Sequence, residues 1–211
     1  MEQYIQAFSE EAITLLRNLP RVEIAKAMNI LQAAYERDGR IYAIGNGGSM
    51  ALATHWVADF NKTVFTHNLD EHARRFQAIR LPTTEEELTA WANDVGYDMV
   101  FAGPLKNYIQ DSDVLIAISS SGNSENVIRA VELARSHKVP VVGLSGFDGG
   151  RLNPLSDARI LVPTPPGEYE LAESIHAIVL HIFTRYFRDY FAHVLLLRKE
   201  KQASNANVVP A

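Results

Sequence analysis

Two short polar stretches of the sequence combine hydroxyl groups, glycines and helix starts in a way that could bind a phosphate. The stretch 119–125, Ser-Ser-Ser-Gly-Asn-Ser-Glu, follows the apolar run 113–118 and precedes a helical pattern over 126–134. This order predicts a strand, a hydroxyl-rich loop and a helix start, where free backbone N–H groups and the helix dipole favour a dianion. Taken alone, the stretch is more typical of a polar turn with Ser124 as the helix N-cap.

The second stretch lies earlier in the chain and repeats the same order. A buried strand is predicted at 40–44, followed by Gly-Asn-Gly-Gly-Ser at 45–49 and by a helix from about Met50 to Phe60. The glycine spacing differs from the dinucleotide pattern G-x-G-x-x-G, and no P-loop lysine follows. Because loops after parallel strands meet at one edge of a sheet, the two loops together predict a site for a small phosphorylated ligand.

Two helices carry candidate metal ligands. His55 and Asp59 are four residues apart on one helix face, a spacing that suits half of a divalent-metal site but also a simple pair on a solvated face. The final helix offers Glu173, His176 and His181. On an ideal helix Glu173 and His181 lie about 12 Å apart along the axis, so both reach one metal only through a late helix start, a bend or full extension of Glu173. His176 is interpreted as a core or interface histidine, with metal ligation in reserve.

These motifs together resemble the sugar isomerase (SIS) domain family. The serine loop is specific to SIS domains in general, and the first loop with His55 and the late helix with His181 narrow the resemblance to the phosphoheptose isomerase branch. The similarity extends from about residue 10 to residue 188. It implies a ketose–aldose isomerase that works through an ene-diol, with an acid, a base and a carbonyl-polarising metal.

The resemblance also implies roles for individual residues. Asp59 and His181 would be the catalytic pair, and zinc or another divalent metal, one per subunit, would be held by His55, Asp59, Glu173 and His181. The implied substrate-binding residues are Asn46, Gly47, Gly48, Ser49, Asn93, Asp94, Ser119, Ser120, Ser121, Ser124 and Glu173. Asp59 stands where the family has glutamate, and Glu173 where it has glutamine. Asn93-Asp94 before Gly96 is also a plausible turn sequence.

The resemblance favours the conversion of sedoheptulose 7-phosphate to D-glycero-D-manno-heptose 7-phosphate for surface-glycan precursors. Isomerisation of another sugar phosphate is one alternative, and the two carboxylate departures favour it. A non-catalytic module that resembles the DnaA initiator-associating factor is another, and SIS domains also act as sugar-phosphate sensors. Retention of both metal-site histidines, His55 and His181, favours the enzyme.

The alternation of strands and helices predicts an α/β fold with a doubly wound parallel sheet, a flavodoxin-like sandwich. Residues 1–198 are expected to form one SIS domain, with N-terminal helices in 1–38, an α/β core with its closing helix in 40–198, and a flexible tail at 199–211. Further expected elements are strands at 76–81, 139–144 and 160–162, helices at 84–91 (capped by Thr84 and Glu87), 104–110 and 170–197, and a turn at 148–150.

Composition agrees with a single enzyme domain. The 211 residues are 47% hydrophobic and 21% charged, with a net charge of −5 that argues against nucleic acid as a partner. The chain contains no cysteine, shows no signal peptide or membrane-length apolar run, and is expected in the cytoplasm. The family resemblance implies a tetramer with sites between subunits, and the apolar final helix suits burial against several neighbours.

Overall fold

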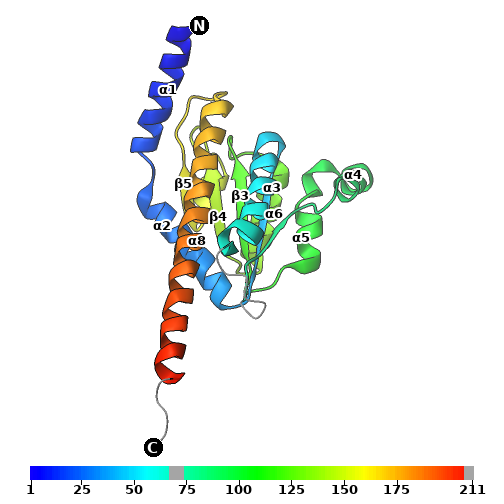
Figure 1. Cartoon of the computed structure of the whole chain (residues 1–211). Coiled ribbons are helices and arrows are strands. Elements are labelled where there is room, and N and C mark those ends of the chain that lie inside the picture. Colours follow the sequence, from blue (N-terminus) through cyan, green and yellow to red (C-terminus); the bar gives the residue numbers. More distant parts are fainter. Residues whose placement is uncertain (67–73, 207–211) are drawn as a thin grey trace, which may run out of the picture.

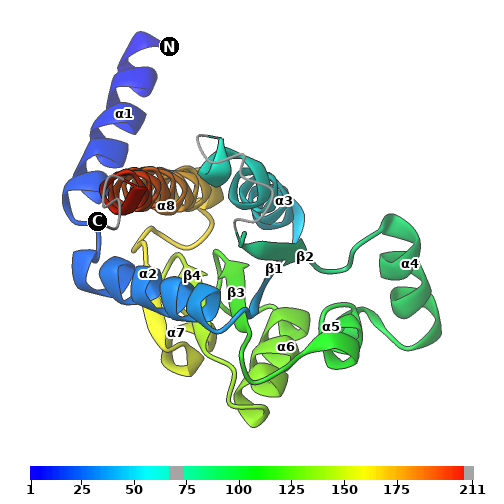
Figure 2. The ribbon, with the colours of Figure 1, turned by 60° about the horizontal axis from the view of Figure 1, so that its bottom comes forward.

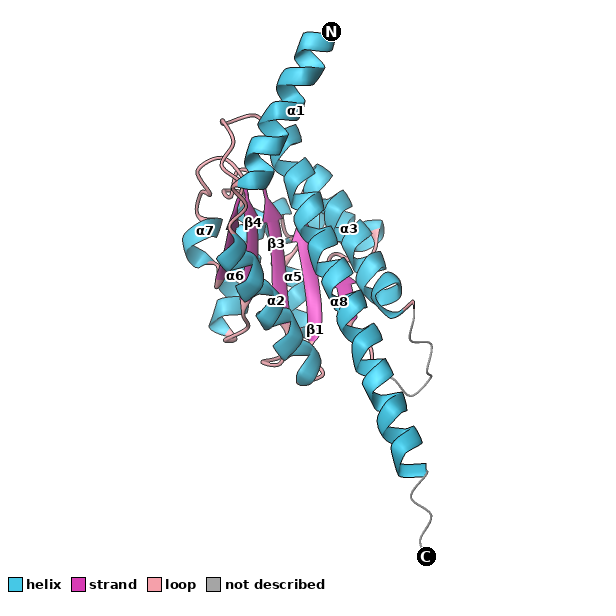
Figure 3. Ribbon diagram, turned by 60° about the vertical axis from the view of Figure 1, so that its left-hand side comes forward, coloured by secondary structure: helices cyan, strands magenta, loops and turns pink. Residues whose placement is uncertain are grey.

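The computed structural model describes residues 1–66 and 74–206, with side chains described as far as Val194. Its centre is a sheet of five parallel strands in the order β2-β1-β3-β4-β5. The strands are β1 Arg40–Gly45, β2 Gln77–Arg80, β3 Val114–Ser119, β4 Val141–Ser145 and β5 Ala158–Leu161. This is the strand order of flavodoxin-like folds. The predicted doubly wound parallel sheet is therefore confirmed, and Figure 3 shows it between its helices.

Helices cover both faces of the sheet (Figures 1 and 2). The helices are α1 Glu2–Arg17, α2 Arg21–Glu36, α3 Gly47–Lys62, α4 Glu85–Asp94, α5 Ala102–Tyr108, α6 Glu125–Ser136, α7 Leu152–Leu155 and α8 Tyr169–Ala206, with 3-10 turns η1 Thr63–Phe65 and η2 Tyr97–Met99. One face is packed by α2, α3 and α8, and the other by α5, α6 and α7. None of the helices in the described residues is long and apolar enough to cross a membrane.

Alternate residues of each strand serve the two faces. In β1, Ile41 and Ala43 belong to the core beneath α2, α3 and α8, whereas Tyr42 and Ile44 belong to the core beneath α5 and α6. A period of two places successive side chains on opposite faces, and a parallel sheet covered on both faces needs apolar residues at every position. This explains why β1 and β3 read as continuous apolar runs.

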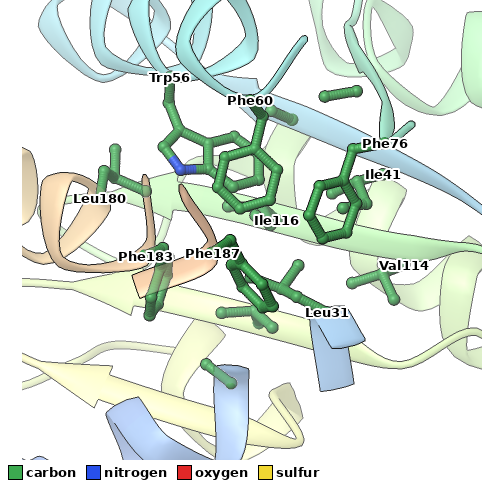
Figure 4. Close-up of a cluster of buried hydrophobic side chains, with 14 of the residues drawn as sticks. Leu31, Ile41, Trp56, Phe60, Phe76, Val114, Ile116, Leu180, Phe183 and Phe187 are labelled. Carbon is green, nitrogen blue, oxygen red and sulfur yellow. The ribbon is translucent and has the colours of Figure 1, made fainter. Parts of the chain in front are cut away.

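Aromatic packing joins α3 to α8 on the first of these faces (Figure 4). Phe60 of α3 lies with its ring centroid 4.0 Å from Trp56, 4.7 Å from Phe76 and 5.6 Å from Phe187 of α8. These large side chains are almost fully buried. Close packing of this kind tolerates little sliding, so it fixes the register between the two helices that carry the candidate metal ligands.

Several element boundaries differ from the sequence expectation. Helix α3 begins at Gly47 rather than near Met50, because Asn46 takes the extended N-cap conformation. Helix α5 begins two residues before Pro104, which is tolerated in a first turn because its missing N–H would be unpaired there. The expected turn at 148–150 is followed by the unpredicted α7. The Thr84 cap is confirmed, since its Oγ1 accepts from the N–H of Glu87 at 3.1 Å.

The described part of the chain has a helix near each of its ends. Helix α1 projects from the body of the protein in Figure 1, and none of its sixteen residues is buried. Helix α8 continues to Ala206, beyond the expected end near Leu197. Residues 207–211 lie outside the described part, and the flexibility expected for 199–211 stays a prediction.

Candidate functional site

The two polar loops meet at the carboxyl edge of the sheet, as their positions after parallel strands predicted. Strands β1 and β3 are neighbours, and Gly45 at the end of β1 pairs with Ile118 in β3. The loops enclose a small cavity of about 100 Å³, which is lined by Asn46, Ser49, Ile118, Ser119, Ser120, Ser121, Ser124, Tyr169 and Glu173. All four serines of the serine loop therefore face one cavity with residues of the first loop and of α8.

The serine loop contains a buried hydroxyl group that its own fold does not use. Ser124 occupies the N-cap position of α6, but its side chain makes no capping bond. Its Oγ instead lies 3.4 Å from Oγ of Ser119. Oγ of Ser120 is buried and has no hydrogen-bond partner among the described residues. A buried hydroxyl without a partner is costly, so this pattern favours the binding site over the simple capped turn.

The segment 146–152, which follows β4 and leads into α7, contacts the backbone of the serine loop and supports it. The N–H of Gly146 donates to the carbonyl of Ser120 at 2.9 Å, and the N–H of Leu152 donates to the carbonyl of Gly122 at 2.9 Å. Gly122 has φ +64°, and a β-carbon there would collide with the backbone of Gly149. Residues 148–150 were expected to form only a turn, because their supporting role arises from the pairing of β3 with β4.

The first loop packs against α8 through a glycine. Gly48 lies in the first turn of α3 directly beside the carboxylate of Glu173, and any β-carbon at position 48 would overlap that carboxylate. Gly47 has φ +53°, a conformation that glycine adopts without strain. Burial and the neighbouring carboxylate of Glu170 raise the pKa of Glu173. Glu173 thus brings a titratable group into the cavity where an anion is expected.

The remaining predicted sugar contacts lie outside this cavity. Asn93 and Asp94 form the exposed C-terminal end of α4, where Asn93 Nδ2 donates to Asp94 Oδ1 at 2.7 Å. The segment that follows them does reach the first loop, because the hydroxyl of Tyr97 donates to Oδ1 of Asn46 at 3.0 Å. Tyr97 and Tyr169 were missed by the sequence analysis, since an isolated tyrosine carries no spacing signal.

His55, Asp59 and His181 form a cluster in which the possible ligand atoms all lie within 4.8 Å of one another. The Nε2 atoms of His55 and His181 are 3.0 Å apart. Oδ2 of Asp59 lies 3.8 Å from Nε2 of His55 and 3.9 Å from Nε2 of His181. Ligands of a tetrahedral zinc ion at about 2.0–2.1 Å lie about 3.3 Å from one another. The chemistry and spacing of the three donors therefore fit a divalent metal with an open position. Glu173 is not part of this cluster.

His176 has a different environment from the other two histidines. It is fully buried, and its Nε2 lies 3.1 Å from the carbonyl oxygen of Ser145, while Nδ1 has no partner among the described residues. Burial lowers the pKa of His176 to about 4, so the ring is neutral at pH 7. The structure thus agrees with the interpretation of His176 as a core histidine, beneath the loop that supports the serines.

Comparisons with known proteins agree with the geometry. A family model described as "SIS domain" matches residues 3–146. The phosphoheptose isomerase of Helicobacter pylori (strain P12) is 35% identical over 170 residues, which cover 81% of this chain and 85% of that protein. The phosphoheptose isomerase of Cytophaga hutchinsonii is 36% identical over 186 residues, 86% of this chain and 94% of that protein.

A solved structure gives the same assignment. The phosphoheptose isomerase of Neisseria gonorrhoeae superposes with a TM-score of 0.77 and 29% sequence identity, over 89% of this chain and 98% of that one. The family model covers both polar loops, and the two relatives above are matched over most of their length. The chain therefore belongs to the SIS domain family and, within it, to the phosphoheptose isomerases.

Proposed function

We propose that this protein is a metal-dependent ketose–aldose isomerase that converts sedoheptulose 7-phosphate to D-glycero-D-manno-heptose 7-phosphate. The proposal rests above all on the arrangement along α3 and α8, which connect the serine cavity to the cluster of His55, Asp59 and His181. Glu173 and His181 are separated by about 12 Å along α8. A linear sugar phosphate would place its phosphate at one end of this path and its carbonyl at the other.

The phosphate end is supported by the hydroxyl groups of the serine loop. Ser119, Ser120, Ser121 and Ser124 line the cavity together with the N-terminus of α6. Hydroxyl donors and free backbone N–H groups at a helix start bind a dianion without a cationic side chain. Asn46, Gly47 and Gly48 lie beside this cavity, where they would contact the sugar hydroxyls.

The reaction end is supported by Asp59 and His181. Isomerisation moves a proton between two neighbouring carbons, so a base must take it from one carbon and an acid must return it to the next. Asp59 and His181 come from different helices and lie 3.9 Å apart, close enough to act on adjacent carbons. Thr63 donates to Oδ1 of Asp59 at 3.1 Å, which orients the carboxylate and leaves Oδ2 toward the histidines.

A divalent metal, which we propose to be zinc, would be held by His55, Asp59 and His181. When bound, such an ion would polarise the carbonyl group of the sugar. Ligation and proton transfer compete for the same lone pairs of Asp59, so one oxygen is expected to serve each purpose. His55, which has no proposed part in proton transfer, is the ligand whose loss would separate metal binding from acid–base chemistry.

We further propose a homotetramer with sites between subunits. Ile178, Ile182 and Tyr186 form an exposed apolar strip on α8 that flanks His181, and α1 contributes further exposed apolar residues such as Ile5 and Ile13. A second subunit on this strip would cover the metal cluster. Light scattering should report a tetramer, and Ile182→Glu should weaken it and lower turnover together. Tyr108→Glu, at an exposed tyrosine of α5, is the control, and a stable wild-type monomer would refute the interface.

The test of the activity is turnover of sedoheptulose 7-phosphate by the purified protein with added zinc. We expect formation of the aldose product and its loss in Asp59→Asn and His181→Ala. Saturable binding of the sugar phosphate without turnover would contradict this reaction and indicate another substrate or a sensor. If the protein showed no turnover and no binding of the sugar phosphate, the enzyme assignment would be overturned in favour of a protein-binding module. Because the substrate is a charged sugar phosphate that does not cross membranes unaided, we propose a cytoplasmic location.

A further inference from the structure

Two buried or half-buried amides join the two ligand loops. Asn46 caps α3 after β1, and Asn126 lies in the first turn of α6 after β3. Nδ2 of Asn46 donates to Oδ1 of Asn126 at 2.9 Å, and Nδ2 of Asn126 donates to Oδ1 of Asn46 at 3.0 Å. The orientation of the Asn126 amide is fixed independently, because the N–H of Val127 donates to its Oδ1 at 2.9 Å.

Asn126 itself is not a lining residue of the cavity. Only 3% of its surface is exposed, and it stands behind Asn46. Asparagine is a weak helix former, and a buried amide costs stability unless each of its polar groups is paired. Here both polar atoms of the Asn126 side chain are used, and both contact Asn46. This position therefore serves the link between the loops rather than the helix.

The link decides which atom Asn46 offers to a ligand. Oδ1 of Asn46 can accept two hydrogen bonds, and it receives them from Asn126 and from the hydroxyl of Tyr97. Nδ2 carries two hydrogens, of which Asn126 takes one. A single N–H of the Asn46 amide is left without a partner among the described residues. Since Asn46 lines the cavity, it faces the ligand as a donor and not as an acceptor.

We propose that Asn126 is a positioning residue that, together with Tyr97, saturates Oδ1 of Asn46 and so makes Asn46 present an N–H to an oxygen of the bound sugar phosphate. This inference rests on the proposed function of the cavity. Its consequence is that recognition at the first loop is set from the phosphate loop, through one side chain. Removal of the Asn126 donor would free Oδ1 of Asn46, which could then turn toward the ligand and meet its oxygens with the wrong polarity.

The test is a double-mutant cycle read by calorimetric binding of sedoheptulose 7-phosphate and, separately, of inorganic phosphate. Asn126→Ala removes the donor without adding a charge, and we expect about tenfold weaker binding of the sugar phosphate. Tyr97→Phe removes the second donor at an exposed position that does not endanger folding, and we expect about threefold weaker binding. Inorganic phosphate, which needs only the serine loop, should bind each variant as it binds the wild type.

The decisive result is the behaviour of both changes in an Asn46→Ala background. If Asn126 and Tyr97 act through Asn46, then neither substitution should weaken binding further once the Asn46 amide is absent. Asn107→Ala, at an exposed asparagine of α5, is the control and should leave binding unchanged. Additive losses, or equal losses for inorganic phosphate, would overturn the positioning role alone. A wild type that binds neither ligand would overturn the proposed function as well.

Discussion

Nε2 of His55 lies 3.0 Å from Nε2 of His181, although 126 positions separate the two residues in the chain. Their rings meet edge to face with centroids 5.2 Å apart. Two neutral imidazoles can share only one hydrogen in such a contact, whereas a cation between them would use a lone pair of each. The contact exists because the packing of Phe60 on Phe187 fixes α3 against α8, so a structural feature of the core sets the geometry of the cluster.

Removal of a cluster histidine should weaken metal binding without unfolding the protein. We expect His55→Ala to lower the zinc affinity at least about tenfold, because second-shell changes alone cost that much, and His181→Ala to lose turnover as well. Zinc titration calorimetry and turnover assays measure the two effects. His193→Ala, at an exposed histidine of α8, the helix that carries His181, is the control and should bind zinc like the wild type. Unchanged zinc binding in His55→Ala would exclude this cluster as the metal site.

Neutralisation of Asp59 should separate chemistry from binding. Asp59→Asn keeps the size of the side chain and the contact with Thr63 but cannot accept a proton, so kcat should fall by about 100-fold or more. The dissociation constant of the sugar phosphate should change much less, because the serine loop is untouched. Stopped-assay turnover and calorimetry on the same preparation provide the comparison. A variant with wild-type kcat would show that the base lies elsewhere.

Two buried serines should respond in opposite ways to the loss of their hydroxyl group. Oγ of Ser120 has no partner among the described residues, so Ser120→Ala should weaken phosphate binding about tenfold and leave the stability unchanged or raised. Oγ of Ser156 donates to the carbonyl of Leu152 at 2.8 Å, so Ser156→Ala should cost about 1 kcal/mol of stability and leave phosphate binding unchanged. Urea unfolding and phosphate titration of both variants test the contrast. Equal behaviour of the two would contradict a ligand role for Ser120.

Glu173 should oppose phosphate binding in a manner that depends on pH. Its raised pKa means that the carboxyl group becomes neutral at a less acidic pH than an ordinary glutamate. As the pH falls through this pKa, the repulsion of a bound phosphate is relieved, so the wild-type affinity should improve relative to Glu173→Gln. Above it, Glu173→Gln should bind more tightly, because it lacks the negative charge. Parallel titrations from pH 4.5, the ordinary pKa of a glutamate, to pH 8 measure the difference, and a constant ratio between the two proteins would contradict the coupling.

His176 should make the stability of the fold depend on acidity. Its pKa is about 4 in the folded state and near 6.5 when unfolded, so between these values only the unfolded chain takes up a proton. Stability should therefore be constant above about pH 6.5 and fall toward pH 4, by on the order of 3 kcal/mol in total. His176→Gln removes this titration and should flatten the decline, whereas His193→Gln should not. Urea unfolding of each variant across this pH range measures the slopes.

The sequence predicted the architecture because the signals were local. Continuous apolar runs at β1 and β3, each followed by a polar loop and a helix, were enough to place both loops at one edge of a parallel sheet. Long-range packing was not visible in the same way. The contact of Gly48 with Glu173, the support of Ser120 by Gly146 and the pairing of Asn46 with Asn126 each join residues from separate units.

The predicted helix boundaries were wrong where tertiary contacts override the local conformational preference of the residues. Gly47 and Gly48 are poor helix formers, and they suggested a loop, yet they form the first turn of α3, where Gly47 has φ +53° and Gly48 lies against the carboxylate of Glu173 in α8. The sequence led us to expect that Glu173 and His181 bind one metal, on condition of a late helix start, a bend or full extension of Glu173. In the structure His181 joins His55 and Asp59, and Glu173 lies in the phosphate cavity instead.

The hydrogen bonds from Gly146 and Leu152 to the serine loop have a consequence for the energetics of ligand capture. They hold the backbone of Ser120 and Gly122 in its binding conformation in the free protein, so the loss of conformational entropy occurs during folding and not during association. Phosphate capture should then proceed without an ordering step, with a rate set by diffusion and charge. The glycines at 122 and 150, where a β-carbon would collide with the other loop, are in this sense determinants of the association rate.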